Sequence, residues 1–291
     1  MTTTNTPTTN TPSTPGHAAS PDLAPALLAH APTPGTSLWV HAHPQEGSFN
    51  DQLFRAGTAA LARRGEVLRS DLYRQGFDPV LRTQDAGDRA TEAGNLATRI
   101  AQAHAAGQIP EPVREEQRKL AAADLLVLQF PLWWYGTPAI LKGWLDRVLT
   151  EGFAYGDMDP ELAVPRRYGD GGLAGRRALV VVTAGEDPAS IGPRGISGDI
   201  ESLLFPLTHG TLWYVGIEVL DIHLVTDADA LGAEGVAHEV DRLRERLAGI
   251  DAERPVPFRS LREGDYRGTR ALREDLLPGR VDLGIHRQIA R

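Results

Sequence analysis

The 291-residue chain is long enough for one large domain or two small ones, and its hydrophobic fraction of 41% can supply a sizeable core. Its net charge of -8 and sequence pI near 5.6 argue against a surface built to bind nucleic acid, which needs clustered Lys and Arg. The lack of cysteine excludes disulfides, thiolate nucleophiles, Cys-ligated zinc and iron–sulfur clusters, and it is compatible with a reducing cytosol.

Residues 1 to 35 are predicted to form a disordered Thr/Pro-rich tail. The opening stretch, "MTTTNTPTTNTPSTPG", is too poor in large apolar side chains to offset the entropy of ordering. A flexible extension is the main interpretation, and a docking or targeting segment is the alternative. The stretch has neither the basic nor the apolar region of a secretory signal. Residues 36 to 291 are expected to form the folded domain with a C-terminal extension.

The first predicted element after the tail is a strand. "SLWVHAH" (residues 37 to 43) is a short apolar run, and the loop "HPQEGSFN" follows it. Residues 50 to 64 then show the apolar spacing of a helix, which Gly65 ends. Residues 66 to 72 alternate like a strand, whereas residues 74 to 108 show no clear pattern.

The middle of the chain predicts a helix, a buried strand and a second helix. "EEQRKLAAADLLVLQF" (residues 115 to 130) ends in a continuous apolar run, typical of a parallel strand covered on both faces. After "PLWWYG", Thr137 is the expected N-cap and Pro138 the expected first residue of the next helix. The inner face of that helix is expected to consist of Ile140, Leu141, Trp144, Leu145 and Val148, with Lys142 and Asp146 paired on the outside.

Two further strands and a helix complete the pattern. The strands are predicted at residues 176 to 183 and, with a Gly interruption, 213 to 225; the helix covers residues 232 to 250. Its expected inner face carries Val240, Leu243 and Leu247. Strands alternating with helices predict an α/β fold with a doubly wound parallel sheet and helices on both faces. Ligands of such sheets bind beyond the carboxyl ends of the strands, so the loops after residues 43, 130 and 183 form the candidate site.

The loop at residues 43 to 50 is a candidate phosphate cradle. Ser48, Asn50 and the free backbone N–H groups of a helix N-terminus suit an anion. A turn that merely caps a helix is the alternative, as is a structural role for His43.

The other two loops would face the same crevice. Trp133, Trp134 and Tyr135 could wall a flat ligand, although aromatic side chains also serve core packing and subunit interfaces. "TAGEDP" offers Thr183 and Gly185 as close backbone contacts, and its alternative is an ordinary turn. "GDGGLAG" (residues 169 to 175) precedes a strand instead of following one, so it is not a dinucleotide fingerprint. No Walker loop, HExxH or nucleophile elbow occurs, and we expect no metal site.

At these residues the sequence resembles the NAD(P)H:quinone oxidoreductase (DT-diaphorase) family of flavodoxin-like flavoproteins. The similarity lies in "QFPLWWYGTPAILKGWLDRVL...FAY", with "HPQEGSFN" upstream and "RGISGDIESLLFPLTHGTLWYVGIEVL" downstream. It spans roughly residues 37 to 290 and is weakest between residues 78 and 108. The resemblance implies a homodimer with a flavin, usually FAD, at each of two sites shared between subunits.

The resemblance also implies roles for single residues. The phosphates and ribityl chain would be held by His43, Ser48, Phe49 and Asn50, and the isoalloxazine by Pro131, Leu132, Trp133 and Trp134. The pyrimidine edge of the flavin would face the backbone of Thr183, Ala184, Gly185 and Glu186. The nicotinamide and acceptor slot would be walled by Tyr135, Phe153 and Tyr155, with Tyr155 and Gly185 closest to the chemistry.

The sequence departs from the family pattern at four positions. A Tyr and a His that help to stabilise charge on reduced flavin are replaced by Ile191 and Ser197. A second slot tyrosine is replaced by Asp157, and an Arg near the FAD diphosphate aligns with Val236, which leaves FMN as an alternative to FAD. A positioned proton donor is typically worth about 100- to 10,000-fold in rate, so slower transfer is expected unless backbone N–H groups near Gly185 compensate.

We therefore expect a cytoplasmic, homodimeric enzyme that transfers a hydride from NAD(P)H through FAD to quinones or similar flat aromatic acceptors in a ping-pong reaction, without a membrane span or nucleic-acid partner. Three alternatives remain. One is an azo- or nitro-reductase, or a tailoring reductase of an aromatic metabolite, on the same scaffold. Another is a flavin-binding regulatory subunit without turnover of its own. A one-electron flavodoxin carrier is disfavoured because the aromatic slot suggests a docked substrate.

Overall fold

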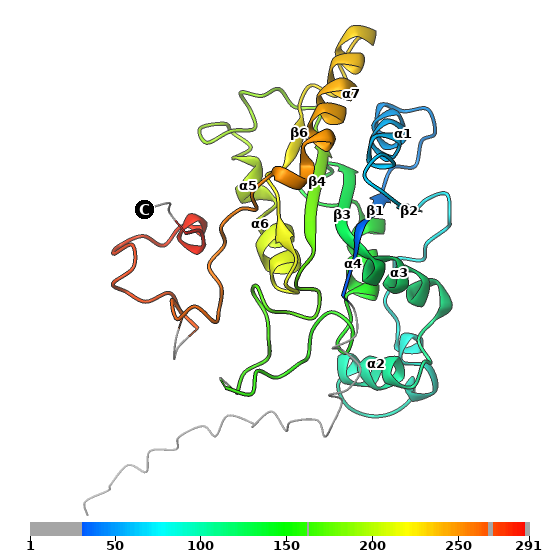
Figure 1. Ribbon diagram of the computed structural model, residues 1–291, viewed down its shortest axis with the longest axis vertical. Coiled ribbons are helices and arrows are strands. Elements are labelled where there is room, and N and C mark those ends of the chain that lie inside the picture. The colour runs from blue at the N-terminus through cyan, green and yellow to red at the C-terminus, as the bar shows by residue number, and fades with distance from the viewer. Residues whose placement is uncertain (1–30, 162, 267–269, 289–291) are drawn as a thin grey trace, which may run out of the picture.

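The computed structural model describes residues 31–161, 163–266 and 270–288, so residues 1 to 30 of the predicted tail lie outside it. Its strands form one parallel sheet in the order β2-β1-β3-β4-β5, and β6 also pairs with β4 (Figure 1). The chain moves outward from β1 to β2 and then crosses back to β3, which makes the edge between β1 and β3 the switch point of a doubly wound sheet. The predicted α/β, flavodoxin-like class is confirmed.

The strands and helices alternate along the chain as expected. The strands are β1 (Thr33–His41), β2 (Val67–Asp71), β3 (Ala123–Pro131), β4 (Arg177–Thr183), β5 (Glu218–Val219) and β6 (His223–Val225). The α-helices are α1 (Phe49–Leu61), α2 (Leu96–Ala105), α3 (Glu111–Ala122), α4 (Ala139–Val148), α5 (Ile200–Leu203), α6 (Phe205–Leu207) and α7 (Ala233–Ala248). Short 3₁₀ segments lie at Thr83–Arg89, Ile250–Ala252 and Leu283–His286, and a π-helix lies at Thr208–Trp213.

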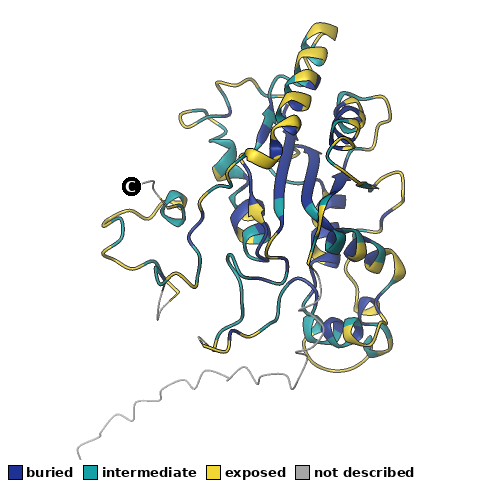
Figure 2. Ribbon diagram, viewed as in Figure 1, coloured by how far each residue is buried: buried dark blue, intermediate teal, exposed yellow. Residues whose placement is uncertain are grey.

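Both faces of the sheet are buried, which explains the continuous apolar runs of β3 and β4 (Figure 2). In β1, Leu38 and Val40 face a core shared with α3 and α4, whereas Trp39 faces the core beneath α1 and α7. The predicted inner faces of α4 and α7 are confirmed, because every side chain named for them is buried. The predicted outer pair also forms, with Lys142 Nζ 2.5 Å from Asp146 Oδ1.

Trp39 sets how closely α1 approaches the sheet. Its indole is fully buried and lies against Gly57 in the middle of α1. A Cβ at Gly57 would overlap the indole ring. Glycine in a helix interior costs about 0.5 to 1 kcal/mol relative to alanine, so this residue is explained by the close packing that it permits.

Some predicted boundaries are wrong. Pro138, not Thr137, is the N-cap of α4, because its extended backbone (ψ 147°) lies outside the helix. The predicted strand at residues 213 to 225 is mostly not a strand: a π-helix ends at Trp213 and the chain turns at Gly216. Leu212, Val215 and Ile217 are buried there, and a buried apolar run cannot by itself distinguish a strand from a helical turn.

Other features lay outside the sequence prediction. β1 begins at Thr33, inside the segment assigned to the tail, and Thr33 pairs with Ala123. Residues 74 to 108 contain the 3₁₀ segment at Thr83–Arg89 and helix α2. These two elements contact each other, and α2 lies below α3 in Figure 1. Among the residues that the structure describes, none of the helices combines the length and apolarity needed to span a bilayer.

Candidate functional site

The loop between β1 and α1 is held by hydrogen bonds within itself. Ser48 is the N-cap of α1, and its Oγ accepts from the Asp51 backbone N–H at 3.2 Å. The same hydroxyl lies 3.0 Å from His43 Nδ1. Gly47 has a left-handed φ of 74°, which brings its N–H to 2.7 Å from Asp51 Oδ2. These hydrogen bonds fix the shape of the loop without a ligand. We call residues 43 to 50 the cradle.

The cradle presents unused hydrogen-bond donors at the start of α1. Within the described part of the chain, the backbone N–H groups of Ser48, Phe49 and Asn50 make no hydrogen bond. Such groups at the positive end of a helix dipole suit a phosphate oxygen. The cradle thus fits the phosphates of a nucleotide cofactor through main-chain donors.

A buried chain of hydrogen bonds joins the cradle to two strands. Asn50 Nδ2 donates to Thr183 Oγ1 at 2.9 Å, and Gln129 Nε2 donates to the Asn50 carbonyl at 2.7 Å. Gln129 Oε1 in turn accepts from Trp39 Nε1 at 2.9 Å. One N–H of the Asn50 amide is therefore committed to Thr183. Sequence reasoning missed Gln129, although a polar residue inside a continuous apolar strand was a usable signal.

His41 and Asp51 lie beneath the cradle and were also missed. His41 is buried against the Phe54 ring, with the ring centroids 4.7 Å apart, and its Nδ1 has no hydrogen-bond partner among the described residues. Burial lowers the pKa of His41 to about 4. Hydrogen bonds from Arg55 and from the Gly47 N–H lower the pKa of Asp51 against the opposing effect of its burial. His41 is thus neutral and Asp51 ionised at neutral pH.

The aromatic segment after β3 forms a tight and exposed turn. Trp134 and Tyr135 have left-handed φ angles of 50° and 57°, and Gly136 N–H donates to the Trp133 carbonyl at 3.1 Å. A turn with two positive φ angles normally uses Asn or Gly, so two bulky aromatics there indicate local backbone strain. The exposed fractions are 42% for Trp133, 97% for Trp134 and 44% for Tyr135. We call residues 133 to 136 the aromatic turn.

The turn lies beside the other two loops of the site. The ring centroids of Trp133 and His43 are 6.4 Å apart. Just before the turn, buried Pro131 ends β3, and the half-buried Leu132 donates its N–H to the Thr183 carbonyl at 2.8 Å. The cradle, the turn and the end of β4 therefore share one edge of the sheet, as the sequence predicts.

The loop after β4 carries a carboxylate that two hydroxyls hold. Ser197 Oγ donates to Glu186 Oε2 at 2.6 Å, and Tyr135 OH donates to Glu186 Oε1 at 2.6 Å. Both hydrogen bonds lower the pKa of Glu186, and the bond from Ser197 contributes more than the bond from Tyr135. Glu186 therefore stays ionised at neutral pH. Ser197, noted in the sequence only as a departure from the family pattern, lies at the site and orients this carboxylate.

The backbone of the same loop is tied to the neighbouring strand. Ala184 N–H donates to the Val225 carbonyl at 2.8 Å, and the Ala184 carbonyl accepts from Ala228 N–H at 2.9 Å. A Cβ at Gly185 would overlap the Asp229 carboxylate, so a larger residue there would have to displace that side chain. Gly185 itself is exposed and its backbone is accessible to a ligand.

Phe153 and Tyr155, which are predicted for the slot, do not contact the aromatic turn within the described single chain. Phe153 is 1% exposed and packs in the main core, with its ring centroid 6.0 Å from that of His104 on α2; its predicted place in the slot stays a prediction. Tyr155 packs edge-on against Tyr214, with centroids 5.9 Å apart, and no ring contact of the described residues joins it to the aromatic turn. Burial raises the pKa of Tyr155, and nearby Glu151 adds to this shift.

The remaining departures from the family pattern have distinct surroundings. Ile191 is 6% exposed, so its side chain supplies packing. Asp157 is half-buried and burial raises its pKa, while Arg166 acts against this shift. Val236 lies on α7.

The sequence and fold match known proteins over most of the chain. A family model described as a flavodoxin-like fold matches residues 36–248. A ribosyldihydronicotinamide dehydrogenase-like protein of Penicillium crustosum is 37% identical over 232 residues, which cover 79% of this chain and 86% of that protein. NAD(P)H dehydrogenase [quinone] 1 of Rattus norvegicus is 32% identical over 225 residues, covering 76% of this chain and 80% of that protein.

A solved structure agrees with the sequence matches. A Klebsiella pneumoniae protein assigned as a quinone reductase superposes with a TM-score of 0.81 at 37% identity, over 87% of this chain and 99% of that one. Sequence similarity and fold agreement extend over the same domain that carries the cradle and the aromatic turn. The chain therefore belongs to the NAD(P)H:quinone oxidoreductase family of flavodoxin-like proteins, a family of oxidoreductases that implies a flavin and NAD(P)H.

Proposed function

We propose that the chain is a homodimeric reductase that binds FAD at the cradle and passes two electrons from NAD(P)H to a quinone or another flat aromatic acceptor. One observation carries the proposal. Three backbone N–H groups at the start of α1, which have no partner in the described part of the chain, lie on the same edge of the sheet as an exposed aromatic turn. The first suits a phosphate and the second suits a flat ring, and a flavin nucleotide has both parts.

The residues of the chain would bind and orient, while the cofactor supplies the redox chemistry. A bound flavin would supply the hydride transfer from NAD(P)H to an acceptor that takes the same place. Ser48, Phe49 and Asn50 would hold the phosphates through their N–H groups, with His43 fixing the Ser48 hydroxyl. Trp133 and the exposed backbone at Gly185 would fix the ring position, which is the main catalytic contribution expected of the protein.

The exposure of the aromatic turn supports the homodimer. An indole that is 97% exposed on a strained turn gains nothing from the single chain. A second subunit over Trp134 and Tyr135 would bury them, close the slot and exclude water from it. We also propose that the protein is cytoplasmic.

The ionised carboxylate of Glu186 limits the acceptors that the slot would take. Because Tyr135 holds it at the slot, an acceptor with a negative substituent would be repelled, whereas a neutral acceptor would not. We therefore expect turnover of menadione and poor turnover of a naphthoquinone sulfonate of similar size. Azo and nitro acceptors that are neutral and flat are the second candidates.

A flavin-binding and turnover experiment tests this function. The purified full chain is supplemented with FAD or FMN, gel-filtered, and observed anaerobically by visible absorption before and after NADPH is added. We expect FAD to be retained, bleached by NADPH and reoxidised by menadione. Retained flavin that NADPH cannot reduce would favour a regulatory subunit, and a chain that retains neither flavin would overturn the proposal.

Two variants sharpen the acceptor test. Glu186→Gln keeps the size and shape of the side chain but removes its charge, so it should raise the turnover of the sulfonate relative to menadione. Asp187→Asn, on an adjacent exposed carboxylate, is the matched control. An equal effect of both variants would contradict a specific role for Glu186.

A further inference from the structure

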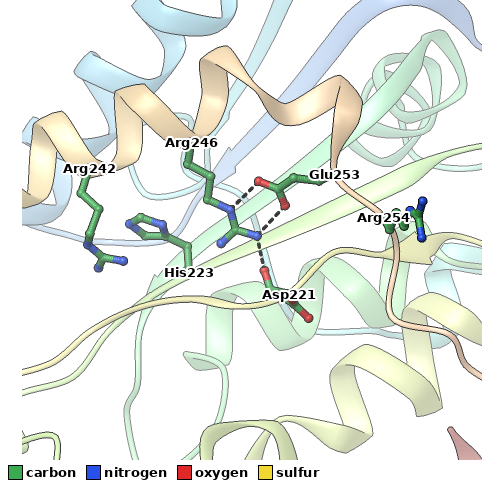
Figure 3. A pocket seen from close by; sticks show the side chains of 6 residues that line it. All are labelled: Asp221, His223, Arg242, Arg246, Glu253 and Arg254. Atoms are coloured by element: carbon green, nitrogen blue, oxygen red, sulfur yellow. Dashed lines mark hydrogen bonds and ion pairs between the residues drawn. The ribbon is translucent and has the colours of Figure 1, made fainter. Parts of the chain in front are cut away.

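A second candidate site lies under α7, where the sheet ends at β5 and β6. A shallow pocket of about 520 Å³, largely open to solvent, lies there and is lined by Asp221, His223, Arg242, Arg246, Glu253 and Arg254 (Figure 3); we call it the cavity. None of these residues belongs to the cradle, the aromatic turn or the loop after β4. The proposed reductase chemistry therefore leaves the cavity unexplained.

His223 is the buried group of this cavity. It lies on β6 opposite Val181, and the residue is only 1% exposed. Its Nε2 is buried and has no hydrogen-bond partner among the described residues. Burial, together with the charges of Arg242 and Arg246, lowers the pKa of His223 to about 3. The cavity wall thus contains a neutral imidazole with an unused nitrogen, and buried polar groups without a partner are rare in proteins.

Two arginines of α7 are held with part of each guanidinium unused. Arg242 donates from Nε to Glu239 Oε2 at 2.6 Å and from Nη2 to the Leu224 carbonyl at 2.7 Å. Arg246 donates from Nε to Glu253 Oε1 at 2.9 Å and from Nη2 to the Asp221 carbonyl at 2.6 Å. Within the described residues, the Nη1 group of each arginine makes no hydrogen bond. The carboxylates therefore orient these groups and leave donors free.

Arg254 and Asp221 add one charge of each sign. The Arg254 guanidinium is exposed on the cavity wall, and the Asp221 carboxylate is exposed at the same cavity. Neither side chain forms an ion pair or hydrogen bond with the described residues. Arg242 and Arg246 are balanced by Glu239 and Glu253, so Arg254 supplies the unbalanced positive charge and Asp221 the unbalanced negative one.

We propose that this cavity binds a sugar phosphate, with the phosphate on the arginines and a hydroxyl on Asp221. Arginine presents its donors in a planar fork that suits phosphate oxygens. A phosphate oxygen between Arg242 and Arg246 would also be the natural partner for an N–H at His223 Nε2. Asp221 can only accept hydrogen bonds when ionised, so it repels a bare anion and selects a ligand with a hydroxyl at its other end.

Calorimetric titration of the full chain tests the site. The probes are ribose 5-phosphate, inorganic phosphate and ribose, each at matched ionic strength. We expect ribose 5-phosphate to bind at least about tenfold more tightly than inorganic phosphate, since only the former can satisfy Asp221. Equal binding of the two would overturn the sugar phosphate as ligand, and no binding of either would overturn the site.

Two variants and a control test which residues of the cavity bind ribose 5-phosphate. Arg254→Gln should weaken ribose 5-phosphate binding about tenfold or more, and Asp221→Asn should reduce the preference for it over inorganic phosphate. Arg244→Gln is the control, because Arg244 lies on the same helix, is exposed and pairs with Asp241 outside the cavity. If Arg244→Gln weakened binding as much as Arg254→Gln, the effect would be general charge and the proposal would be wrong.

A spectroscopic readout locates the ligand. The imidazole nitrogen signals of His223 should shift when ribose 5-phosphate binds, whereas those of His43 in the cradle should not. Flavin binding and menadione turnover by Arg254→Gln should match those of the natural chain. A shift at His43 in place of His223 would place the phosphate in the cradle and overturn the second site.

Discussion

The cradle and the aromatic turn lie on the same edge of the sheet but are built in opposite ways. The cradle makes its hydrogen bonds within itself and is fixed to β3 and β4 by the buried Gln129 and Asn50. The aromatic turn has strained φ angles and exposes its rings. The difference indicates that the cradle has its shape without a ligand, whereas the aromatic turn leaves its rings uncovered; under the proposed function, a cofactor or a second subunit would cover them.

Gln129→Leu should break the cradle and is the largest expected effect. It would leave the Trp39 indole N–H buried without its partner and would remove the bond from Gln129 to the Asn50 carbonyl. A buried unpaired polar group costs about 1 to 3 kcal/mol, so we expect a loss of about 1 to 3 kcal/mol in the free energy of unfolding. Urea denaturation measures this, and flavin retention should fall with it. Gln45→Leu, on an exposed residue of the same loop, is the control; equal losses would contradict the anchoring role of Gln129.

The second largest effect is expected at acid pH, where protonation of His41 beneath the cradle should lower the stability of the folded chain. The pKa of His41 is about 4 in the folded chain against 6.5 ordinarily, so below pH 6.5 the unfolded chain binds the proton first. Stability is therefore full above pH 6.5 and falls as the pH drops toward about 4. His41→Leu should lose less stability over this window than the natural chain. Thermal unfolding at several pH values checks this, and parallel curves for the two chains would show that His41 contributes nothing.

Backbone strain in the aromatic turn predicts a smaller effect on folding stability, which is a gain instead of a loss. Glycine adopts a left-handed φ without steric cost, whereas alanine does not. Trp134→Gly should therefore be more stable than Trp134→Ala by about 1 kcal/mol in the chain without ligand. Both variants should lose flavin retention and dimer formation to the same extent, because both lack the indole. Equal stability of the two variants would mean that the turn is not strained.

The smallest expected effect concerns the two hydrogen bonds to Glu186, which link the aromatic turn to the loop after β4. Ser197→Ala removes the larger of the two bonds that lower the Glu186 pKa, and Tyr135→Phe removes the smaller one. Both variants should raise the Glu186 pKa, Ser197→Ala more than Tyr135→Phe. Because the folded pKa is lowered, the bonds stabilise the chain at neutral pH and that contribution is lost as the pH falls through the Glu186 pKa. Carbon-detected NMR titration of the Glu186 carboxyl measures the shift, and an unchanged pKa in Ser197→Ala would contradict the hydrogen bond.

Much of the fold was predictable because its signals are local. The apolar run of β3 identified a strand covered on both faces, and the spacing of Val240, Leu243 and Leu247 identified the inner face of α7. The predictions failed where local signals are ambiguous. A buried apolar stretch around Val215 fits a helical turn as well as a strand.

The sequence by itself determined the alternation of strands and helices, the edge of the sheet at which the three candidate loops lie, the capped start of α1 and the aromatic character of the turn. Each depends on residues within a few positions of one another. Only the tertiary structure decided that Asn50 bonds to Thr183, 133 residues away, that Tyr135 and Ser197 hold Glu186, and that a buried His223 faces the arginines of α7. The physical reason is that these contacts depend on strand register and on how α7 packs over β6, and no local pattern of residues records either.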